Sequence, residues 1–307
     1  MTGTCEGVMQ QAEKLLFNGQ ADEALALFSK EAENGNGRAM YFLGFILEHG
    51  LGHTAQDEDK AAAWFDKGQK AGDALAILAA ARWLGMDDRY HLLKDAFPKA
   101  RAMAEDNDCF AKVELADMYL SGGIMINFEE GIHLLSQACA MGYWYALEKM
   151  GDLCQEGLLV DKNEARAFAF YSKAAAAGHD HYSEYQLGCA WYDGIGTAMD
   201  REKGLSLLKK AWKDGSSDAA YRLALIAENG IGIPPDEQKA ALWYQRAAEM
   251  GNTLAKGALG YFYEKGLGGL PEDMEKARTL YKEAAEEGDD ESQFRLEVLE
   301  KSGKDRI

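Results

Sequence analysis

Histidine and cysteine, which often serve as catalytic residues or metal ligands, are few and scattered along this 307-residue chain. Two histidine pairs are close enough in sequence to be considered as ligands of one metal ion. His49 and His53 flank the Gly50-Leu51-Gly52 turn, so they do not share a helical face as the zinc ligands of a metalloprotease do. The His179-Asp180-His181 segment falls in a predicted turn. These side chains are better interpreted as ordinary polar residues of a loop than as metal ligands. We therefore predict no metal site and no cofactor.

Other chemical motifs are missing as well. No Gly-x-Ser-x-Gly segment and no phosphate loop occurs. The residues that follow the Gly-x-Gly pairs do not match the motif of a dinucleotide-binding site. No nucleophile, base and orienting group converge, so we predict no catalytic residues. The cysteines share no metal-ligand spacing; they are Cys5, Cys109, Cys139, Cys154 and Cys189. Cys109 and Cys139 fall at neighbouring ends of two predicted antiparallel helices, so a disulfide is possible, with buried free thiols as the favoured alternative.

Glycine recurs along the chain with a fixed period. One series follows a Leu-Gly or Leu-Ala pair by several residues and returns every 35 to 37 positions: Gly50, Gly85, Gly122, Gly157, Gly194, Gly230 and Gly266. A second series has the same period: Gly35, Gly72, Asn107, Gly142, Gly178, Gly215, Gly251 and Gly288. Two series with one period indicate a repeat protein.

Each repeat is predicted to contain two helices, which we call helix A and helix B. Helix A ends at a glycine of the first series, which supplies a left-handed cap. Its small residues allow close approach of helix B; they are Gly44, Ala79, Ala116, Gly151, Gly188, Ala224 and Gly260. Helix B reads Lys-Ala-x-x-Trp-Tyr-x-x-Ala-Ala, as at Lys239–Ala248. Acidic residues suit its N-terminus; they are Asp57, Asp161, Asp200, Asp236 and Asp273.

These patterns resemble the Sel-one-like repeat, a relative of the tetratricopeptide repeat. The best copy runs from Ala220 to Gly251, followed by Ala255–Gly288 and Ala39–Gly72, and the similarity covers roughly residues 8–303. The resemblance implies an all-α fold, an α/α solenoid of about eight helix-turn-helix repeats that winds into a right-handed superhelix. It also implies a role in binding other proteins.

We expect residues 1–307 to form a single repeat domain. Residues 5–36 would be a shortened N-terminal capping repeat, residues 37–290 seven repeats of 35–37 residues, and residues 291–303 a C-terminal capping helix. The third repeat departs most from the pattern, because Asp87 replaces a glycine and Pro98 falls inside the expected helix B. Proline costs about 3 kcal/mol in a helix interior, so this helix is expected to start late or kink.

The formal net charge of −18 argues against nucleic acid and anionic membranes as partners. It favours a basic or mixed-charge protein or peptide. Residues 1–20 lack the basic and apolar segments of a secretory signal, so we expect a cytoplasmic protein, with an exported mature form as the alternative. We also expect a monomer.

The partner is expected to contact helix A, by analogy with tetratricopeptide repeats, at positions two before, two after and five after the leucine of Leu-Gly. These positions combine aromatic rings and carboxylates, which suits a basic segment with apolar side chains. The alternative is that several rings pack against the next repeat. The predicted partner-binding residues are Tyr41, Phe45, Glu48, Trp83, Asp117, Glu148, Asp152, Tyr185, Tyr192, Tyr221, Glu228, Tyr261 and Glu264.

Three functions fit these features to different degrees. The first is a non-enzymatic scaffold or adaptor that holds a partner in an acidic, aromatic concave groove. The second is a bacterial immunity or inhibitor protein that neutralises a cognate basic toxin, a role that the resemblance suggests. The remote third is an enzyme, for which only the His179–His181 turn offers side chains.

Overall fold

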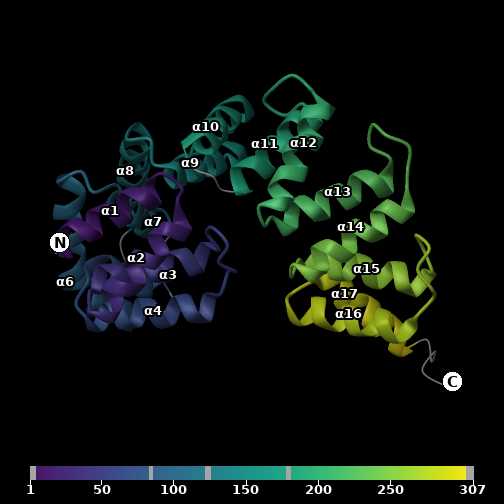
Figure 1. The fold of residues 1–307 in the computed structure, drawn as a ribbon, viewed down its shortest axis with the longest axis horizontal. Helices are drawn as coiled ribbons and strands as arrows, with labels where there is room; N and C mark the ends of the chain where they lie inside the picture. The colour runs from purple at the N-terminus through teal and green to yellow at the C-terminus, as the bar shows by residue number, and fades with distance from the viewer. Residues whose placement is uncertain (1–4, 83–85, 122–125, 178–180, 302–307) are drawn as a thin grey trace. The chain divides into compact units, whose positions relative to one another are not determined.

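The computed structural model describes residues 5–82, 86–121, 126–177 and 181–301, with the backbone alone at residues 5–6, 86–89 and 300–301. The described residues form seventeen α-helices and no strand (Figure 1). Helices A and B alternate along the chain as the repeat pattern predicts, so the all-α solenoid prediction is confirmed. The chain divides into two compact units, residues 1–183 and 184–307.

The first unit contains five helix pairs. In chain order they are α1 (Cys5–Phe17), α2 (Ala21–Glu33), α3 (Gly37–His49), α4 (Glu58–Lys70), α5 (Ala74–Ala81), α6 (Met86–Glu105), α7 (Cys109–Leu120), α8 (Phe128–Ala140), α9 (Trp144–Glu156) and α10 (Glu164–Ala177). Helices of one pair pack against each other, and α2, α4, α6 and α8 also pack against the helix A that follows each of them.

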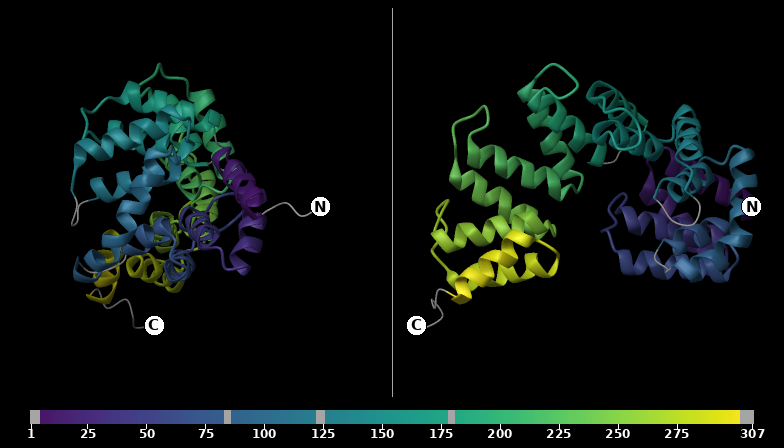
Figure 2. Two further views of the ribbon diagram at one scale, coloured as in Figure 1. Left: turned by 90° about the vertical axis from the view of Figure 1, so that its left-hand side faces the viewer. Right: turned by 180° about the vertical axis from the view of Figure 1, so that it is seen from behind.

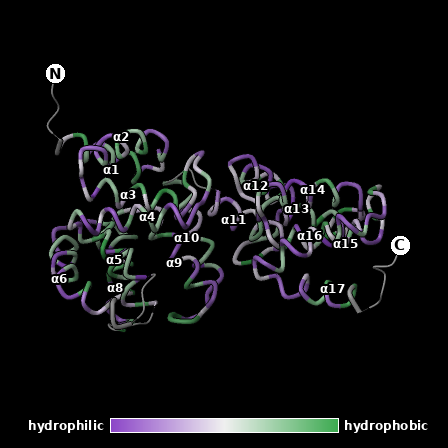
Figure 3. Tube along the Cα trace, turned by 90° about the horizontal axis from the view of Figure 1, so that it is seen from below, coloured by the Kyte–Doolittle hydropathy of each residue, from purple (hydrophilic) through white to green (hydrophobic). Residues whose placement is uncertain are grey.

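The second unit contains three pairs and a final helix. They are α11 (His181–Asp193), most of which belongs to this unit, α12 (Arg201–Lys213), α13 (Ser217–Asn229), α14 (Glu237–Glu249), α15 (Thr253–Lys265), α16 (Met274–Glu286) and α17 (Asp290–Lys301). Figure 2 shows the pairs from two further sides. Apolar and polar residues alternate along the helices, as the changing colour of the tube in Figure 3 shows. No helix in the described part of the chain is both long enough and apolar enough to cross a bilayer.

Capping residues fix where the helices start and stop. Five A helices end at a left-handed glycine, with φ between 60° and 74° at Gly50, Gly157, Gly194, Gly230 and Gly266. The predicted aspartates cap the B helices α4, α12, α14 and α16. In α10, however, the Arg166 amide donates to the side chain of Asn163 at 2.9 Å, so Asn163 is the cap rather than Asp161.

Glycines in helix A lie directly against large side chains of helix B. A Cβ atom on Gly44 would lie 2.5 Å from the Phe65 ring, and one on Gly151 would lie 2.6 Å from the Tyr171 ring. Such distances are far below van der Waals contact. The prediction that small residues mark close helix crossings is therefore confirmed at these positions.

The third repeat is irregular, as predicted, but in another way. Its helix A, α5, is only 8 residues long, whereas α6 has 20 residues and contains Pro98. The expected late start is wrong, because α6 begins twelve residues before the proline. Leu93, Phe97 and Ala100 are buried on both sides of Pro98, and this burial offsets the hydrogen bond that proline cannot donate.

Candidate partner-binding surface

The predicted contact positions recur on successive A helices, and the surface that they form is here called the A-helix face. In the first unit α3 contacts α5 and α5 contacts α7, so these faces adjoin between repeats. The surface is therefore built from equivalent positions of successive A helices. Whether a side chain can meet a partner then depends on its exposure.

Two aromatic rings of the first unit are buried within it. Tyr41 is 1% exposed and donates its hydroxyl to Glu114 Oε1 at 2.8 Å. Phe45 is 2% exposed and meets the Tyr145 ring edge-on, with ring centroids 5.2 Å apart. Tyr41 and Phe45 thus serve as core residues here, the alternative that the sequence left open.

Helix α9 covers these rings because it reaches back to the start of the chain. The Trp144 indole N–H donates to the Leu16 carbonyl at 3.1 Å. One residue away on each helix, the Phe17 and Tyr143 rings stack with centroids 5.7 Å apart. These contacts join α1 to α9 across 128 positions of sequence. The aromatic rings of Tyr41 and Phe45 on the A-helix face of the first unit are consequently covered by the unit's own side chains.

The acidic positions of the first unit are paired with cations from neighbouring A helices. Arg82 lies 2.9 Å from Glu48, 3.7 Å from Glu114 and 3.8 Å from Asp117. Lys149 lies 3.0 Å from Asp117. Charges that are largely removed from water need such pairing. Glu48 and Asp117 therefore belong to an internal ion network that connects α3, α5, α7 and α9.

Burial shifts the titration of two neighbours in this network. It raises the pKa of Glu48 to about 7, partly opposed by the Arg82 charge. It lowers the pKa of His49 to about 3. The His49 imidazole is thus neutral near pH 7, and its 3.8 Å approach to Glu48 is then no ion pair. Its Nδ1–H donates to the Phe45 carbonyl at 2.9 Å, so Nε2 accepts from the Tyr145 hydroxyl at 2.6 Å.

The remaining acids of the first unit accept hydrogen bonds from hydroxyl groups. Glu148 is 5% exposed and accepts from Ser183. Asp152 Oδ1 accepts from the hydroxyls of Tyr171 at 2.7 Å and Tyr182 at 2.6 Å. These acids are held in place by the fold.

A tyrosine of helix B holds the acid of the same repeat in the second unit too. The Tyr244 hydroxyl donates to Glu228 Oε2 at 2.5 Å, and the Tyr281 hydroxyl donates to Glu264 Oε2 at 2.9 Å. Together with Tyr171 and Asp152, this contact occurs in three repeats. The sequence reasoning treated these tyrosines only as core residues. The signal was present, since each tyrosine follows its acid by 16 to 19 positions.

Three predicted tyrosines of the second unit remain partly exposed. Tyr185, Tyr221 and Tyr261 are half-buried at the edges of apolar clusters on α11, α13 and α15. Tyr192, in contrast, is fully buried and donates its hydroxyl to the Ile231 carbonyl. Tyr185, Tyr221 and Tyr261, with the half-buried Glu228 and Glu264, are the predicted residues that this unit leaves open to solvent.

Cations also lie on this face, and the sequence reasoning missed them. Arg222 contacts both carboxylate oxygens of Asp193, at 2.7 and 2.6 Å. The Arg295 guanidinium lies over the Tyr261 ring, 4.7 Å from its centroid. Neither arginine occupies one of the three helix positions that were considered, which explains the omission. The face of the second unit therefore carries both signs of charge.

The remaining sequence candidates concern metals and thiols. Trp83 and His179 lie outside the described residues. Among the residues that are described, no group of three His, Cys, Asp or Glu side chains could hold a metal. Cys109, Cys139, Cys154 and Cys189 are free thiols; of the two cysteines considered for a disulfide, Cys109 is buried, as the favoured alternative predicts, whereas Cys139 is half-buried.

The helix pairs and their capping define an all-α protein of the helical-repeat class. The family model of the Sel1 repeat matches residues 37–73, 110–143, 144–179, 181–216, 217–252 and 254–289. These matches cover most of the chain, which therefore belongs to the Sel1 repeat family, as its sequence predicts. Residues 74–109, which contain the irregular α5 and α6, lie outside the matches.

Curated relatives include fungal regulators. The chain is 28% identical over 253 residues to chitin synthase regulatory factor 3 of Schizosaccharomyces pombe, covering 78% of this chain and 27% of that protein. It is 27% identical over 216 residues to the chitin synthase regulator SKT5 of Saccharomyces cerevisiae, covering 68% of this chain and 30% of that protein. The chain thus matches less than a third of the length of either regulator.

Solved structures share the fold over nearly the whole chain. A Sel1 repeat protein from Oxalobacter formigenes is 22% identical, with a TM-score of 0.57, and the match covers 96% of this chain and 86% of that one. The protective antigen c5321 of uropathogenic Escherichia coli is 24% identical, with a TM-score of 0.53 and coverage of 97% and 64%. At these identities the similarity shows the fold alone.

Proposed function

We propose that the protein is a non-enzymatic interaction scaffold that binds a partner protein on the A-helix face of its second unit. The observation that carries this proposal is the exposure of Tyr185, Tyr221 and Tyr261, in contrast with the buried Tyr41 and Phe45 of the first unit. Partly exposed tyrosines are typical anchors of protein interfaces. Membership of the Sel1 repeat family and the relatives named as regulators support a binding role.

The partner is proposed to be a segment that carries basic and apolar side chains. Tyr244 holds Glu228 through Oε2, and this fixes the carboxylate while its other oxygen remains for a basic group. Leu225 lies beside Tyr221 in the apolar cluster of this unit and provides an apolar contact. The net charge of −18 favours approach of a basic segment to a monomer.

A displayed peptide library selected on the whole chain tests this proposal. We expect enriched peptides to combine Lys or Arg with aromatic or aliphatic residues. The double substitution Tyr221→Ala and Tyr261→Ala should weaken their binding by at least about tenfold, because interface tyrosines commonly contribute a kcal/mol or more each. Isothermal titration with the enriched peptides provides the measurement, and circular dichroism checks the fold.

Tyr90→Ala is the matched control, because Tyr90 is 56% exposed but lies on α6 in the first unit. It should leave peptide binding unchanged. Enrichment of acidic peptides, or equal affinity for the double variant and the wild-type chain, would show that this face is not the binding surface.

A further inference from the structure

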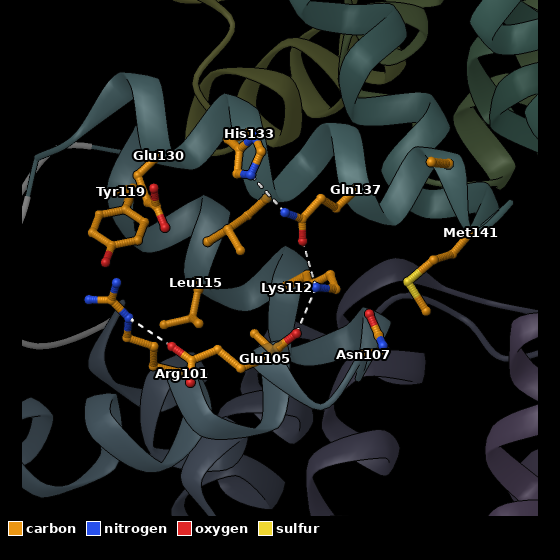
Figure 4. A pocket seen from close by; sticks show the side chains of 13 residues that line it. Arg101, Glu105, Asn107, Lys112, Leu115, Tyr119, Glu130, His133, Gln137 and Met141 are labelled. Carbon is orange, nitrogen blue, oxygen red and sulfur yellow. Dashed lines mark hydrogen bonds and ion pairs between the residues drawn. The ribbon is translucent and has the colours of Figure 1, made fainter.

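A pocket of about 620 Å³ lies in the first unit, among the end of α6, the buried side of α7 and helix α8 (Figure 4). Its volume falls in the usual range for small-molecule sites. Leu115 and Leu134 supply apolar wall, and Met141 lies at one end, opposite Tyr119 and Glu130 in the view of Figure 4. The pocket is separate from the proposed partner surface, which belongs to α11–α15.

Lys112 is the most unusual residue of this pocket. It is only 4% exposed, and among the described residues its ammonium group forms no ion pair. Nζ donates to the Ala104 carbonyl and to Gln137 Oε1, both at 2.6 Å. Both acceptors are neutral, although the last turn of α6 offers some favourable dipole. An ammonium has three N–H donors, so these two bonds leave one donor.

Another repeat of the same chain has a lysine at the equivalent position, and there a carboxylate completes the arrangement. Lys256 is the fourth residue after the N-cap of α15, as Lys112 is after the N-cap of α7. Lys256 forms an ion pair with Glu287, the C-cap residue of α16. The C-cap residue of α8, at the position that corresponds to Glu287, is Met141. The carboxylate that partners the lysine in one repeat is thus replaced by a methionine in the other, and Met141 lines the pocket.

From this internal comparison we infer that the pocket binds a small aliphatic carboxylate whose oxygens pair with Lys112. The ligand carboxylate takes the role that Glu287 plays for Lys256, and its hydrocarbon part lies against Leu115, Leu134 and Met141. A buried ammonium gains most from a charged partner, because its desolvation is otherwise offset only by neutral acceptors. Gln137 is oriented to assist, since its amide donates to His133 Nε2 at 2.7 Å and directs its oxygen toward Lys112.

Carboxylates of this kind have two sources, a free short-chain acid or the C-terminus of a peptide. Hexanoate and the tripeptide Ala-Ala-Leu with a free C-terminus represent them, with hexanamide and the tripeptide amide as uncharged controls. Methyl NMR of the whole chain at pH 7.5, in a buffer without carboxylates, should show shifts of the Leu115, Leu134 and Met141 methyl signals with hexanoate or the free peptide. Binding of hexanoate alone would identify the ligand class as free short-chain acids. Preferential binding of the free peptide would identify it as peptide C-termini.

Two substitutions test the role of Lys112. Lys112→Met introduces the side chain that Met40 already places at this position in α3, and should weaken carboxylate binding by at least about tenfold. Met141→Glu gives Lys112 an internal carboxylate partner like Glu287. It should therefore weaken binding of the added carboxylate to a similar degree, and it should raise the melting temperature of the protein. This second variant keeps the test valid if Lys112→Met proves poorly folded.

Met250→Glu is the control, because Met250 is the C-cap residue of α14 and is 38% exposed, against 39% for Met141. Its repeat has Ala220 at the position of Lys112, so the new charge has no lysine to pair with. Binding should be unchanged in this variant. The inference is overturned if neither hexanoate nor the free peptide shifts the pocket methyls, or if both bind the Met141→Glu protein as they bind the wild-type chain.

Discussion

Carboxylates on the A-helix face are held by different donors according to the side chain that helix B supplies. Where helix B carries Tyr171, Tyr244 or Tyr281, the hydroxyl bonds to the acid of the same repeat. Where it carries Phe65, no hydroxyl is present and Glu48 pairs with Arg82 instead. A tyrosine in helix B thus gives the acid of its own repeat a donor, whereas Phe65 leaves Glu48 to a cation of the next repeat.

Gly204 provides a prediction at the scale of one residue. A Cβ atom there would lie 2.7 Å from the Tyr192 amide nitrogen and 2.8 Å from the Gly188 carbonyl oxygen. Both are backbone atoms, so a rotamer change cannot relieve the clash. We expect Gly204→Ala to destabilise the protein by about 1–3 kcal/mol. Helix propensity alone would stabilise the variant by about 1 kcal/mol, so the sign of the change in urea unfolding separates the two effects.

The shifted pKa values of His49 and Glu48 predict opposite dependences of stability on pH. His49 has a folded pKa of about 3 and an ordinary value of 6.5, so between these values only the unfolded chain binds the proton, and stability falls as pH falls. Glu48 has a folded pKa of about 7 and an ordinary value of 4.5. Between those values only the folded chain binds the proton, so stability falls as pH rises.

Relative to the wild-type chain, His49→Gln should therefore lose stability less between pH 6.5 and 4.5 as the solution is acidified. Glu48→Gln should lose more over the same interval. Urea unfolding at several pH values in this range measures both slopes. Identical slopes in the two variants would mean that neither side chain has a shifted pKa in the folded state.

At the scale of elements, helix termini follow local rules that can be read from the sequence. The left-handed glycines and the aspartate caps fall where the repeat pattern places them, because each depends on a few consecutive residues. Asn163 shows the limit of this reading, since Asp161 is also polar and lies only two positions away. The geometry of the Arg166 amide distinguishes them.

This assignment can be tested by two alanine substitutions. Asn163→Ala should cost about 1 kcal/mol of stability, the usual effect of removing an N-cap side chain. Asp161→Ala should change stability by much less, because α10 does not use that residue as its cap. Thermal unfolding of both variants provides the measurement, and an equal loss in the two would contradict the assignment.

The length of α6 and the burial of Tyr41 and Phe45 on the A-helix face could not be predicted from local sequence, because tertiary contacts determine both. Proline propensity predicts that α6 starts late or kinks, but it does not account for Leu93 and Phe97, which gain burial only in the folded unit. Tyr41 and Phe45 are aromatic residues at the same type of position as Tyr221 and Tyr261. The contacts of Tyr41 with Glu114 and of Phe45 with Tyr145 distinguish the two sets, and no spacing in the sequence predicts either contact.

At the scale of the whole molecule, the two units differ in how far their contacts reach. The first unit connects Leu16 with Trp144, so its first and fifth A helices are in contact. In the second unit the hydrogen bonds and ion pairs described above join helices of the same or adjacent repeats. Solenoids with contacts between neighbours alone lose their terminal repeats first, whereas long-range contacts make unfolding cooperative.

Hydrogen exchange should report this difference. We expect amides in the cores of α1, α3, α7 and α9 to open with similar free energies, and amides of α17 to exchange faster than those of α13. Trp144→Phe removes the bond to the Leu16 carbonyl, so α1 and α2 should then exchange faster than α7. Exchange from α1 that is already much faster than from α7 in the wild-type chain would contradict the cooperative behaviour.

The contact between α1 and α9 also bears on how such an array changes over evolutionary time. Repeat proteins grow and shrink by duplication or loss of whole repeats, each about 36 residues long here. An extra copy inserted between α3 and α9 would carry Trp144 away from Leu16, so duplication there costs a contact that the unit already uses. A copy inserted among α12–α16 would only lengthen a series of neighbours. We therefore expect the number of repeats to be constrained in the first unit and freer to vary in the second.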